Sequence, residues 1–326
     1  MVSGTEQGFP RLLGDVGGTN ARWAWQPDAA TPPQDIRVLP TAADATIADS
    51  ARRYLADCGP ARPAAVAIGI ATPVTGDAVT MTNHHWAFSI AALQRELGGG
   101  RCLVINDFTA LALSLPALTA DGLRPVGGGA AVAAMPMALL GAGTGLGVSG
   151  LLPAPGGGLV AIGGEGGHVT LGANDEEESA LLVLLRRRFG HVSAERVLSG
   201  QGLVNLYAAL TQQQGGTAWP LTPAELTAAA AAGTDARATQ AVRLFTGFLG
   251  DVAGNLALTL GARGGVYIGG GIVPQLGAGF DAALFRSRFE SKGRFGEYLA
   301  AIPAWVIIAP APALIGASRA LDLLPG

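Results

Sequence analysis

Lysine is almost absent from this chain of 326 residues. Lys292 is the only one, and arginine carries the rest of the positive charge. A Walker-type phosphate loop needs a Gly-Lys-Ser/Thr run, and no such run occurs. Any phosphate site must therefore use backbone N–H groups, a metal ion or arginine. The formal net charge of −3 also provides no positive field to attract nucleic acid, so no nucleic-acid partner is expected.

Cysteine and histidine are scarce as well. The two cysteines, Cys58 and Cys102, lie far apart and lack partners at metal-site spacing. Neither a disulfide framework nor a zinc knuckle is expected, and the composition favours a reducing compartment. The four histidines form no H-E-x-x-H or related cluster, which argues against protein-bound zinc.

No charged residue occurs between Arg124 and Glu165, a pattern that superficially resembles a membrane span. Glycines and prolines interrupt the segment, however, and no window of about 18 residues reads as an unbroken apolar helix. The N-terminal residues 1–10 also lack the basic and apolar regions of a secretion signal. Buried strands joined by glycine turns fit better, and we expect no membrane partner.

Short apolar runs alternate with helical patterns, which predicts an α/β protein with mixed sheets covered by helices. The predicted strands are Leu12–Val16, Arg22–Gln26, Val66–Ala71, Ala78–Thr82, Cys102–Ile105, Met137–Gly141, Gly147–Leu152, Leu159–Ile162, Val266–Ile268 and Val306–Ala309. The predicted helices are Asp44–Asp57, Ser89–Leu97, Phe108–Leu115, Asp175–Arg188, Gly202–Gln212, Thr222–Ala232, Asp235–Leu260, Asp281–Phe289 and Leu314–Leu324. Asp44 and Ser89 are expected as N-caps.

Two segments repeat one plan: Leu12–Thr19 and Ala138–Gly145 are each an apolar strand followed by a glycine turn that carries threonine. The repeat suggests a duplicated core with one phosphate loop in each half. In the first loop, Gly17 and Gly18 let the backbone approach a ligand, and successive N–H groups can bind an anion. Asp15 would repel bare phosphate, so its position fits if Mg²⁺ lies between them. An ordinary hairpin turn is the alternative.

The second loop, Gly141–Gly147, lies between two strands, so its glycine spacing is not a dinucleotide fingerprint. Its N–H groups and the Thr144 hydroxyl could cup a phosphate. A third group, Gly269–Gly271, follows an apolar strand and could lie against adenine or ribose. A plain strand-to-helix turn is equally compatible with this third group.

Polar residues end one buried strand. Asn106 and Asp107 follow Leu103–Ile105, at the strand end where open α/β sheets bind ligands. Asp107 could accept a proton from a sugar hydroxyl while Asn106 binds neighbouring hydroxyls. Alternatively, Asp107 caps the helix that follows.

Glu165 is flanked by four glycines, with His168 close behind. Such a backbone could present both side chains to a polyol, although a plain loop is the alternative. Glu195 could join them, but beside Ser193 it would more often belong to a capping box. The acidic run Asp175–Glu178 is expected to be a solvated first helical turn without a catalytic role.

Seven motifs, in this order, resemble the bacterial glucokinase family. They are Asp15–Arg22 (DVGGTNAR), Thr82–Ser89 (TNHHWAFS), Asn106–Ala110 (NDFTA), Gly141–Gly147 (GAGTGLG), Gly164–Val169 (GEGGHV), Ser193–Leu203 (SAERVLSGQGL) and Gly269–Val273 (GGGIV). The resemblance runs from about Leu12 to the C-terminal helix. It implies an actin-like, hexokinase-type ATPase fold with two domains around a cleft: 1–117 plus 311–326, and 118–310.

The resemblance also implies an ATP-dependent glucokinase that phosphorylates the 6-hydroxyl of D-glucose at the start of glycolysis. Asp107 would be the catalytic base, and Asn106, Glu165, His168 and Glu195 would join it in binding glucose. ATP would contact Gly14, Asp15, Val16, Gly17, Gly18, Thr19, Gly143, Thr144, Gly145 and Gly270. No side chain is expected to bind metal directly: Mg²⁺ would be held mainly by ATP, with water linking it to Asp15. A cytoplasmic homodimer is implied.

One residue departs from the family pattern: His85 stands before Trp86 where a smaller polar residue is expected, which affects only rim contacts. The related ROK kinases usually carry a Cys-rich zinc motif, and no such cysteines follow His168. A repressor of that branch would need an N-terminal DNA-binding segment, for which about ten residues leave no room. A non-catalytic sugar sensor, another hexose substrate, and ADP or polyphosphate as donor remain alternatives.

Overall fold

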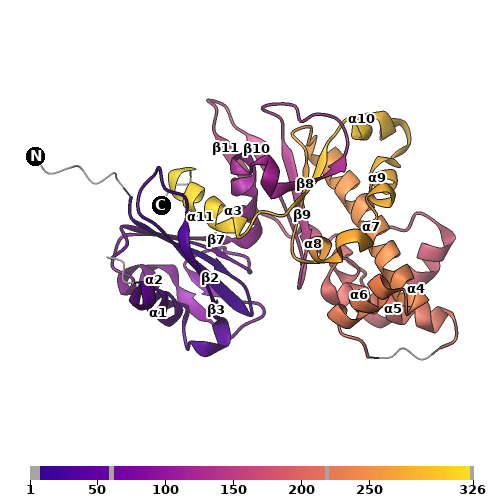
Figure 1. Ribbon diagram of the computed structural model, residues 1–326, viewed down its shortest axis with the longest axis horizontal. Helices are drawn as coiled ribbons and strands as arrows, with labels where there is room; N and C mark the ends of the chain where they lie inside the picture. The colour runs from indigo at the N-terminus through magenta and orange to yellow at the C-terminus, as the bar shows by residue number, and fades with distance from the viewer. Residues whose placement is uncertain (1–7, 59–61, 217–219, 324–326) are drawn as a thin grey trace, which may run out of the picture. The chain divides into compact units, whose positions relative to one another are not determined.

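The computed structural model describes residues 8–58, 62–216 and 220–323, which form two compact units. The first unit contains residues 1–119, 154–163 and 309–326, and the second contains 120–153 and 164–308 (Figure 1). The predicted domains, 1–117 plus 311–326 and 118–310, differ from these units by two residues at the boundaries and by the segment 154–163. They stay a prediction.

The first unit is built on a five-stranded sheet in the order β3-β2-β1-β4-β7. Its strands are β1 (Arg11–Val16), β2 (Asn20–Gln26), β3 (Gln34–Pro40), β4 (Ala65–Ile70) and β7 (Arg101–Asn106). Strands β1, β4 and β7 run parallel, whereas β2 and β3 are antiparallel to their neighbours. The parallel register aligns Val16, Ile70 and Asn106 in one row, so these three strands end together.

Helices cover both faces of this sheet, which explains why β4 is buried along its whole length. On one face, α1 (Ile47–Cys58) and α2 (Ile90–Glu96) pack on a core that includes Trp23 and Ile68 (Figure 1). On the other face lie α3 (Asp107–Ser114) and α11 (Pro312–Leu323). A short hairpin, β5 (Ala78–Thr80) and β6 (Ala87–Ser89), precedes α2.

The C-terminal helix approaches α3 unusually closely. A Cβ atom on Gly316 would lie 1.6 Å from the carbonyl oxygen of Ala110, so only glycine fits there. Helix α11 also contacts β1 and β4. The end of the chain therefore belongs to the packing of the first unit. The predicted end of this helix, Leu324, lies outside the described residues.

In the second unit the sheet runs β10-β9-β12-β13-β8. Its strands are β8 (Leu123–Gly127), β9 (Met137–Ala142), β10 (Leu146–Pro153), β12 (Val266–Gly269) and β13 (Ala304–Ile307); β11 (Leu159–Ile162) is grouped with the first unit. Strand β9 is antiparallel to β10 and parallel to β12, which is parallel to β13. The same pattern occurs in β2-β1-β4-β7, so the predicted repeat of a strand–glycine turn–strand unit is confirmed.

Most of the remaining second unit is helical. They are α4 (Glu176–Phe189), α5 (Gly200–Gln213), α6 (Pro223–Ala232), α7 (Ala236–Leu260), α8 (Ile272–Leu276), α9 (Ala282–Glu290) and α10 (Gly296–Ala300). Helix α7 begins after the N-cap Asp235 and ends at Gly261 in the left-handed conformation, as helices commonly do.

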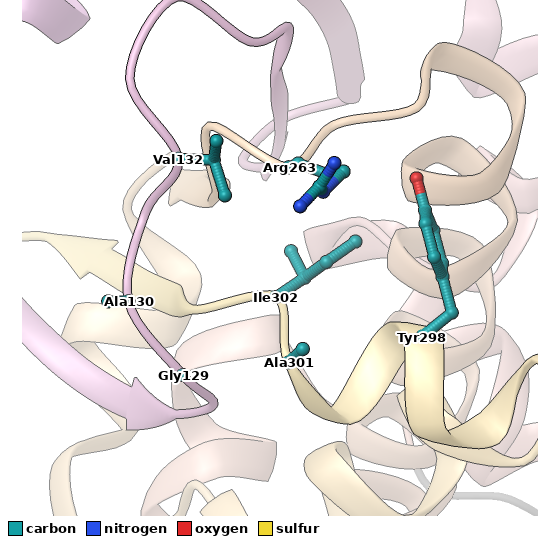
Figure 2. A pocket seen from close by; sticks show the side chains of 7 residues that line it. All are labelled: Gly129, Ala130, Val132, Arg263, Tyr298, Ala301 and Ile302. Atoms are coloured by element: carbon teal, nitrogen blue, oxygen red, sulfur yellow. The ribbon is translucent and has the colours of Figure 1, made fainter.

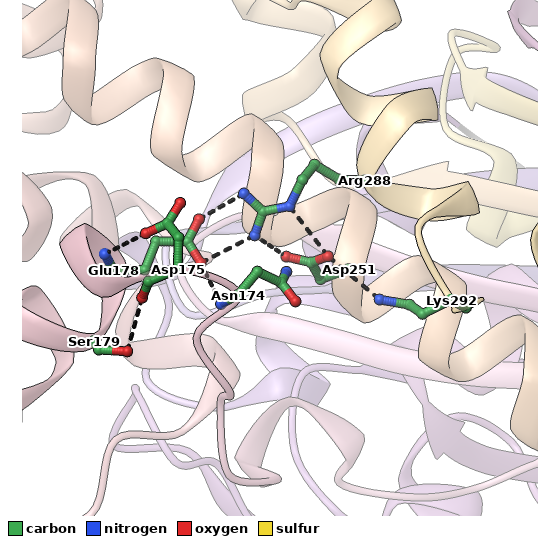
Figure 3. A network of polar contacts seen from close by, with 7 residues as sticks. All are labelled: Asn174, Asp175, Glu178, Ser179, Asp251, Arg288 and Lys292. Atoms are coloured by element: carbon green, nitrogen blue, oxygen red, sulfur yellow. Dashed lines mark hydrogen bonds and ion pairs between the residues drawn. The ribbon is translucent and has the colours of Figure 1, made fainter.

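A buried ionic network links α4, α7 and α9 (Figure 3). Arg288 donates a hydrogen bond of 2.5 Å to the Glu178 carboxylate and forms an ion pair with Asp251. On the far side of Asp251, the Lys292 Nζ lies 3.3 Å from the Asp251 carboxylate. Burial disfavours the charged guanidinium, but hydrogen bonds and charge from both carboxylates outweigh it and raise the pKa of Arg288. The expectation that the Asp175–Glu178 run is wholly solvated is wrong, because the Glu178 side chain is only 1% exposed.

One of the two predicted N-caps needs correction. Helix α1 begins at Ile47 rather than Asp44, which instead ends a 3-10 turn, Thr41–Ala43. The Thr46 hydroxyl accepts a hydrogen bond from the Asp49 N–H at the start of α1. Ser89, by contrast, is confirmed as the N-cap of α2. Within residues 8–58, 62–216 and 220–323, no helix has both the length and the apolar character needed to cross a bilayer.

Candidate active site

The predicted site residues are distributed over both units. The first unit holds Gly14, Asp15, Val16, Gly17, Gly18, Thr19, Asn106 and Asp107, and the second holds Gly143, Thr144, Gly145, Glu165, His168, Glu195 and Gly270. Each half has its own local geometry, and the two are described in turn.

Asp107 is the first residue of α3, immediately after β7. The side-chain oxygen of Asn106 accepts hydrogen bonds from the N–H groups of Phe108, at 2.9 Å, and Thr109, at 3.2 Å. Asn106 is therefore the N-cap, and the alternative that Asp107 caps the helix is wrong. Asp107 is partly exposed at the edge of the sheet, where its carboxylate also accepts from the Phe108 N–H at 2.9 Å.

The first glycine loop starts at the same edge of the sheet. Val16 and Asn106 stand in one row with Ile70 between them, so Gly17 and Asp107 follow strand ends about 10 Å apart, two strand spacings. The loop closes through a hydrogen bond from the Gly17 N–H to the Asn20 carbonyl, at 2.9 Å. The parallel sheet thus brings the candidate base and the candidate phosphate loop together.

Gly18 allows a second segment to approach this loop. A Cβ atom on Gly18 would lie 2.9 Å from the carbonyl oxygen of Asn83, too close for any other residue without movement. Asn83 belongs to the Thr82–Ser89 motif, in which the departing residue His85 is exposed. The loop and this motif therefore form one surface.

Asp15 lies beneath the loop and forms an ion pair with Arg22 at 3.1 Å. The Asp15 side chain is only 18% exposed, and this burial raises its pKa, against the opposing effects of the Arg22 charge and hydrogen bond. Arg22 ends the Asp15–Arg22 motif, and the motif alone indicates no role for it. It is the arginine that offsets the carboxylate next to the candidate phosphate site.

Replacing Asp15 by Asn is expected to stabilise the chain at pH 7 in the absence of nucleotide and Mg²⁺. The folded chain binds a proton at the Asp15 carboxyl more tightly than the unfolded chain does. The stability of the unaltered chain therefore falls as the pH rises from below 3.8 through the raised pKa of the folded state. The gain should vanish at acidic pH. Urea unfolding at several pH values from about 3 to 7 measures the gain at neutral pH and its loss at acidic pH.

Asp28→Asn is the matched control for this series. Hydrogen bonds from Thr31 and Ala30 lower the pKa of Asp28, with the Thr31 side chain the largest contributor. Folding therefore favours the charged form of Asp28. Above the ordinary carboxyl pKa, Asp28→Asn should lower the stability of the chain, whereas Asp15→Asn should raise it. Equal pH profiles for the two variants would contradict the assignment.

Thr72 is a site residue that the sequence reasoning missed. Its carbonyl oxygen faces the side-chain amide of Asn106 at 3.5 Å, and its hydroxyl lies 3.1 Å from that of Thr82. It thereby connects the residue before the candidate base to the Thr82–Ser89 motif. The available signal was its position just beyond the end of a buried strand, β4, the same signal that identified Asp107.

In the second unit, the turn after β9 is held by backbone hydrogen bonds. The Gly143 N–H donates to the Gly145 carbonyl at 2.8 Å, and the Gly200 N–H donates to the Gly143 carbonyl at 2.9 Å. Gly270 comes next to this turn because β12 pairs with β9. At φ +78° and with its Cβ position 2.3 Å from the Ala142 oxygen, it must be glycine. The second loop and the Gly269–Gly271 group are thus neighbours.

Glu195 supports the same turn. Its Oε2 accepts a hydrogen bond from the Leu146 N–H at 2.9 Å, and a Cβ atom on Gly145 would lie 2.4 Å from that oxygen. The capping-box alternative is wrong, because Ser193 caps its short helix by accepting from the Arg196 N–H while Glu195 turns to the loop.

The segment that carries Glu165 and His168 packs beside the same turn. The short helix Gly166–His168 packs against β10, where a Cβ atom on Gly167 would lie 2.1 Å from the Leu146 carbonyl oxygen. A bridge between Thr170 and Ser193 joins this segment to that of Glu195. Leu146 is therefore contacted on two sides: Glu195 accepts a hydrogen bond from its N–H, and Gly167 lies against its carbonyl oxygen. Glu165 and His168 are both exposed, so their side chains are accessible to a ligand.

Glu195→Ala is expected to lower kcat/KM about ten- to hundredfold, because it leaves the Leu146 N–H without its acceptor next to the loop. Glu195→Gln retains an acceptor oxygen, so its KM for the phosphoryl donor should stay near that of the unaltered chain. Steady-state kinetics of both variants test this. Equal losses in the two would show that the charge, rather than support of the turn, is what matters.

A shallow cavity of about 380 Å³ also lies in the second unit (Figure 2). Arg263 and Tyr298 project into it above Ile302 and Ala301, and none of the predicted site residues lines it. We assign it no part in the site. Over the described ranges, no group of three or more His, Cys, Asp or Glu side chains is arranged to hold a metal ion.

A family model described as Glucokinase matches residues 12–323. The chain belongs to the glucokinase family. Its similarity to individual members is high: the glucokinase of Aromatoleum aromaticum is 52% identical over 323 residues, 99% of this chain and 97% of the relative. The glucokinase of Chromobacterium violaceum is 51% identical over 321 residues, 98% of this chain and 92% of the relative.

A longer relative contains a similar segment. The "Bifunctional protein glk" of Burkholderia thailandensis is 50% identical over 313 residues, 96% of this chain but 48% of that protein. The glucokinase family therefore occurs both in chains of about this length and as one part of larger proteins.

Solved structures confirm the predicted fold class. A glucokinase from an Antarctic psychrotroph aligns with a TM-score of 0.87 at 32% identity, covering 96% of this chain and 98% of the other. More distant structures show the fold alone. The Balamuthia mandrillaris glucokinase in complex with glucose has a TM-score of 0.78 at 21% identity, covering 98% and 94%. A ROK family glucokinase from Streptomyces griseus with glucose and AMPPNP has a TM-score of 0.66 at 20% identity, covering 95% and 98%.

Proposed function

We propose that this chain transfers the γ-phosphoryl group of ATP to the 6-hydroxyl of D-glucose, giving glucose 6-phosphate and ADP. The observation that carries the proposal is the shared edge of the parallel sheet, where Asp107 and the Gly17–Gly18 turn follow aligned strand ends. Membership of the glucokinase family supports the reaction and both substrates. We assign the reaction to the first step of glycolysis.

Asp107 acts as the general base in this scheme. Phosphoryl transfer needs a group that positions the attacking hydroxyl and accepts its proton, together with charge stabilisation. Asn106 fixes the start of α3 through its two backbone acceptor contacts, so the Asp107 backbone is held rigidly. The side-chain amide of Asn106 has two N–H donors. One faces the Thr72 carbonyl oxygen, and the other would be available for a sugar hydroxyl.

The second unit supplies the remaining contacts. We assign Glu165, His168 and Glu195 to the glucose hydroxyls, and the Gly143–Gly145 turn with Gly270 to the nucleotide. Bare backbone at both glycine groups leaves N–H donors accessible to phosphate oxygens. These donors would bind phosphate in place of the lysine of a Walker loop, because the one lysine of this chain forms an ion pair with Asp251.

Mg²⁺ suits the chemistry of this donor set. Mg²⁺ keeps several water molecules and binds through one or two carboxylates plus substrate phosphates. Asp15, a single carboxylate beneath the first glycine loop, matches that requirement, and its Arg22 partner can rearrange because its side chain is 43% exposed. The ion would be held mainly by ATP, with water linking it to Asp15, and it would supply charge neutralisation at the phosphates.

We further propose a cytoplasmic homodimer. Support for the compartment comes from Cys58 and Cys102, both free, since reduced thiols are typical of cytoplasmic proteins. The second copy follows from the family resemblance.

A coupled assay with purified protein tests the reaction directly. ADP formation should depend on both glucose and Mg²⁺, and the glucose product should carry phosphate at the 6-position by NMR. A panel of glucose, mannose and N-acetylated hexoses, each with ATP, ADP or polyphosphate, would define the substrates. Glucose binding without phosphoryl transfer from any donor would instead indicate a sugar sensor.

A further inference from the structure

Thr41 is a buried polar residue that lies outside the seven sequence motifs. It directly follows β3 and opens the 3-10 turn Thr41–Ala43. Its hydroxyl donates to the Gly18 carbonyl oxygen at 3.0 Å, and its N–H donates to the Thr19 carbonyl oxygen, also at 3.0 Å. One residue thus holds two successive carbonyl groups of the first glycine loop.

The hydroxyl contact of Thr41 decides which way one N–H group of the loop points. The Gly18 carbonyl and the Thr19 N–H belong to one peptide group, and in a trans peptide the two point in opposite directions. Because the carbonyl faces Thr41, the Thr19 N–H faces away from it, on an exposed residue. In the part of the chain that the structure describes, neither the Gly18 N–H nor the Thr19 N–H has a hydrogen-bond acceptor. Both donors are therefore available to a ligand with acceptor oxygens.

The segment that carries Thr41 is itself fixed. The Trp86 Nε1 donates to the Asp44 carbonyl oxygen at 3.2 Å, and the Trp86 side chain is buried. The segment of Trp86 also places the Asn83 carbonyl against Gly18. The glycine loop is therefore contacted by two segments that are hydrogen-bonded to each other.

Adjacent glycines let the loop approach a ligand closely, but they also give it the most conformational freedom to lose. Hydrogen-bond donors that are already held in place bind a charged group without that cost. We propose that Thr41 is a positioning residue for phosphoryl transfer: by holding the Gly18 and Thr19 carbonyls, it directs the Thr19 N–H, next to that of Gly18, at the phosphates of ATP. The inference rests on the proposed function, in which this loop binds ATP.

Thr41→Val keeps the shape of the side chain but removes the hydroxyl. It should raise the KM for ATP about three- to tenfold, the usual effect of losing one hydrogen bond. The dissociation constant of the ATP analogue AMPPNP, measured by calorimetry, should rise by the same factor, and that of glucose should not change. Thr41→Ala removes the same hydroxyl without placing a methyl group against the Gly18 carbonyl, so it should give the same result. Thr41→Ser keeps the hydroxyl and should restore the affinity for both nucleotides.

Thr46→Val is the matched control, because Thr46 lies in the same connection between β3 and α1. Its hydroxyl accepts from the Asp49 N–H at 3.1 Å, so its partner is the start of the helix rather than the loop. The variant should lower the thermal midpoint and leave the KM for ATP unchanged. It thereby separates a loss of stability from a loss of positioning.

Circular dichroism of each variant establishes that the chain has folded. Folded Thr41→Val and Thr41→Ala variants with the KM for ATP of the unaltered chain would overturn the inference and leave the proposed reaction intact. So would a Thr41→Ser variant as impaired as Thr41→Val, or an equal rise in the dissociation constant of glucose. An unaltered chain that transfers no phosphate from ATP would instead overturn the proposed reaction, and this inference with it.

Discussion

Replacing Asp107 by Asn should lower kcat for glucose phosphorylation by roughly 10²- to 10⁴-fold, the usual contribution of a general base. Asparagine has the same shape and can still accept the hydrogen bond from the Phe108 N–H that the Asp107 carboxylate accepts now. What it cannot do is take up the proton of the attacking hydroxyl. The loss should therefore fall on kcat and leave the KM for glucose within a few-fold.

Two controls separate this loss from misfolding. Glucose binding, measured by calorimetry, should persist in Asp107→Asn, and the thermal midpoint should stay close to that of the unaltered chain because Asn106 still caps α3. Thr109→Ser, two residues further along the same helix, should retain activity. A variant that phosphorylates glucose at near-normal rates would show that another group accepts the proton.

Elements defined by local sequence were predictable. Strands β1, β4 and β9 are short apolar runs, and helices α2, α4, α6 and α7 begin after Ser89, Asp175, Thr222 and Asp235, whose side chains accept from the backbone N–H groups that every helix start leaves unpaired. Each of these signals lies within a few residues of the element that it defines. The parallel order of β1, β4 and β7 likewise follows from helices between apolar strands.

Elements defined by distant contacts were not predictable. Strand β3 (Gln34–Pro40) is an edge strand that is almost wholly exposed, and it depends on pairing with β2, which lies earlier in the sequence. Its short alternation, Ile36 and Val38 with Asp35 and Arg37 beside them, points to no buried face. Glu178 reads as one member of a solvated acidic run, because its partner Arg288 lies 110 positions away in the sequence. Its spacing of three, four and seven residues from Leu181, Leu182 and Leu185 does place it on the apolar face of α4, but no nearby residue indicates the cation that pairs with it there.

In the candidate site, too, residues marked by a local sequence signal were predictable, and residues defined by distant contacts were not. Asp107 stands out because a polar residue directly after a buried strand is placed at the ligand-binding edge of a sheet. Thr72 carries the same signal after β4, but no motif drew attention to it. The contact of Glu195 with the Leu146 N–H depends on packing between segments 49 residues apart, so the sequence left its role open between ligand and helix cap.

Arg288→Ala should destabilise the chain by about 3–5 kcal/mol, the usual cost of breaking a buried ion pair by removing one partner. The variant leaves Glu178, with a side chain 1% exposed, and Asp251, at 7%, facing each other with Lys292 as the remaining cation nearby. Urea unfolding monitored by tryptophan fluorescence measures the apparent loss. Arg243→Ala, at an exposed position of α7, should change stability by less than about 0.5 kcal/mol.

The loss should arise from the stranded carboxylates rather than from the missing attraction, and a second variant separates the two. Attraction between buried charges is largely cancelled by the cost of removing them from water. Glu178→Gln/Asp251→Asn/Arg288→Met removes all three charges while keeping similar volumes, so it should recover much of the stability lost in Arg288→Ala. Glu178 also accepts from the Asn174 N–H at 2.8 Å, and glutamine retains an oxygen for that contact. A triple variant less stable than Arg288→Ala would show that the ionic network itself, and not the avoidance of unpaired charge, holds α4, α7 and α9 together.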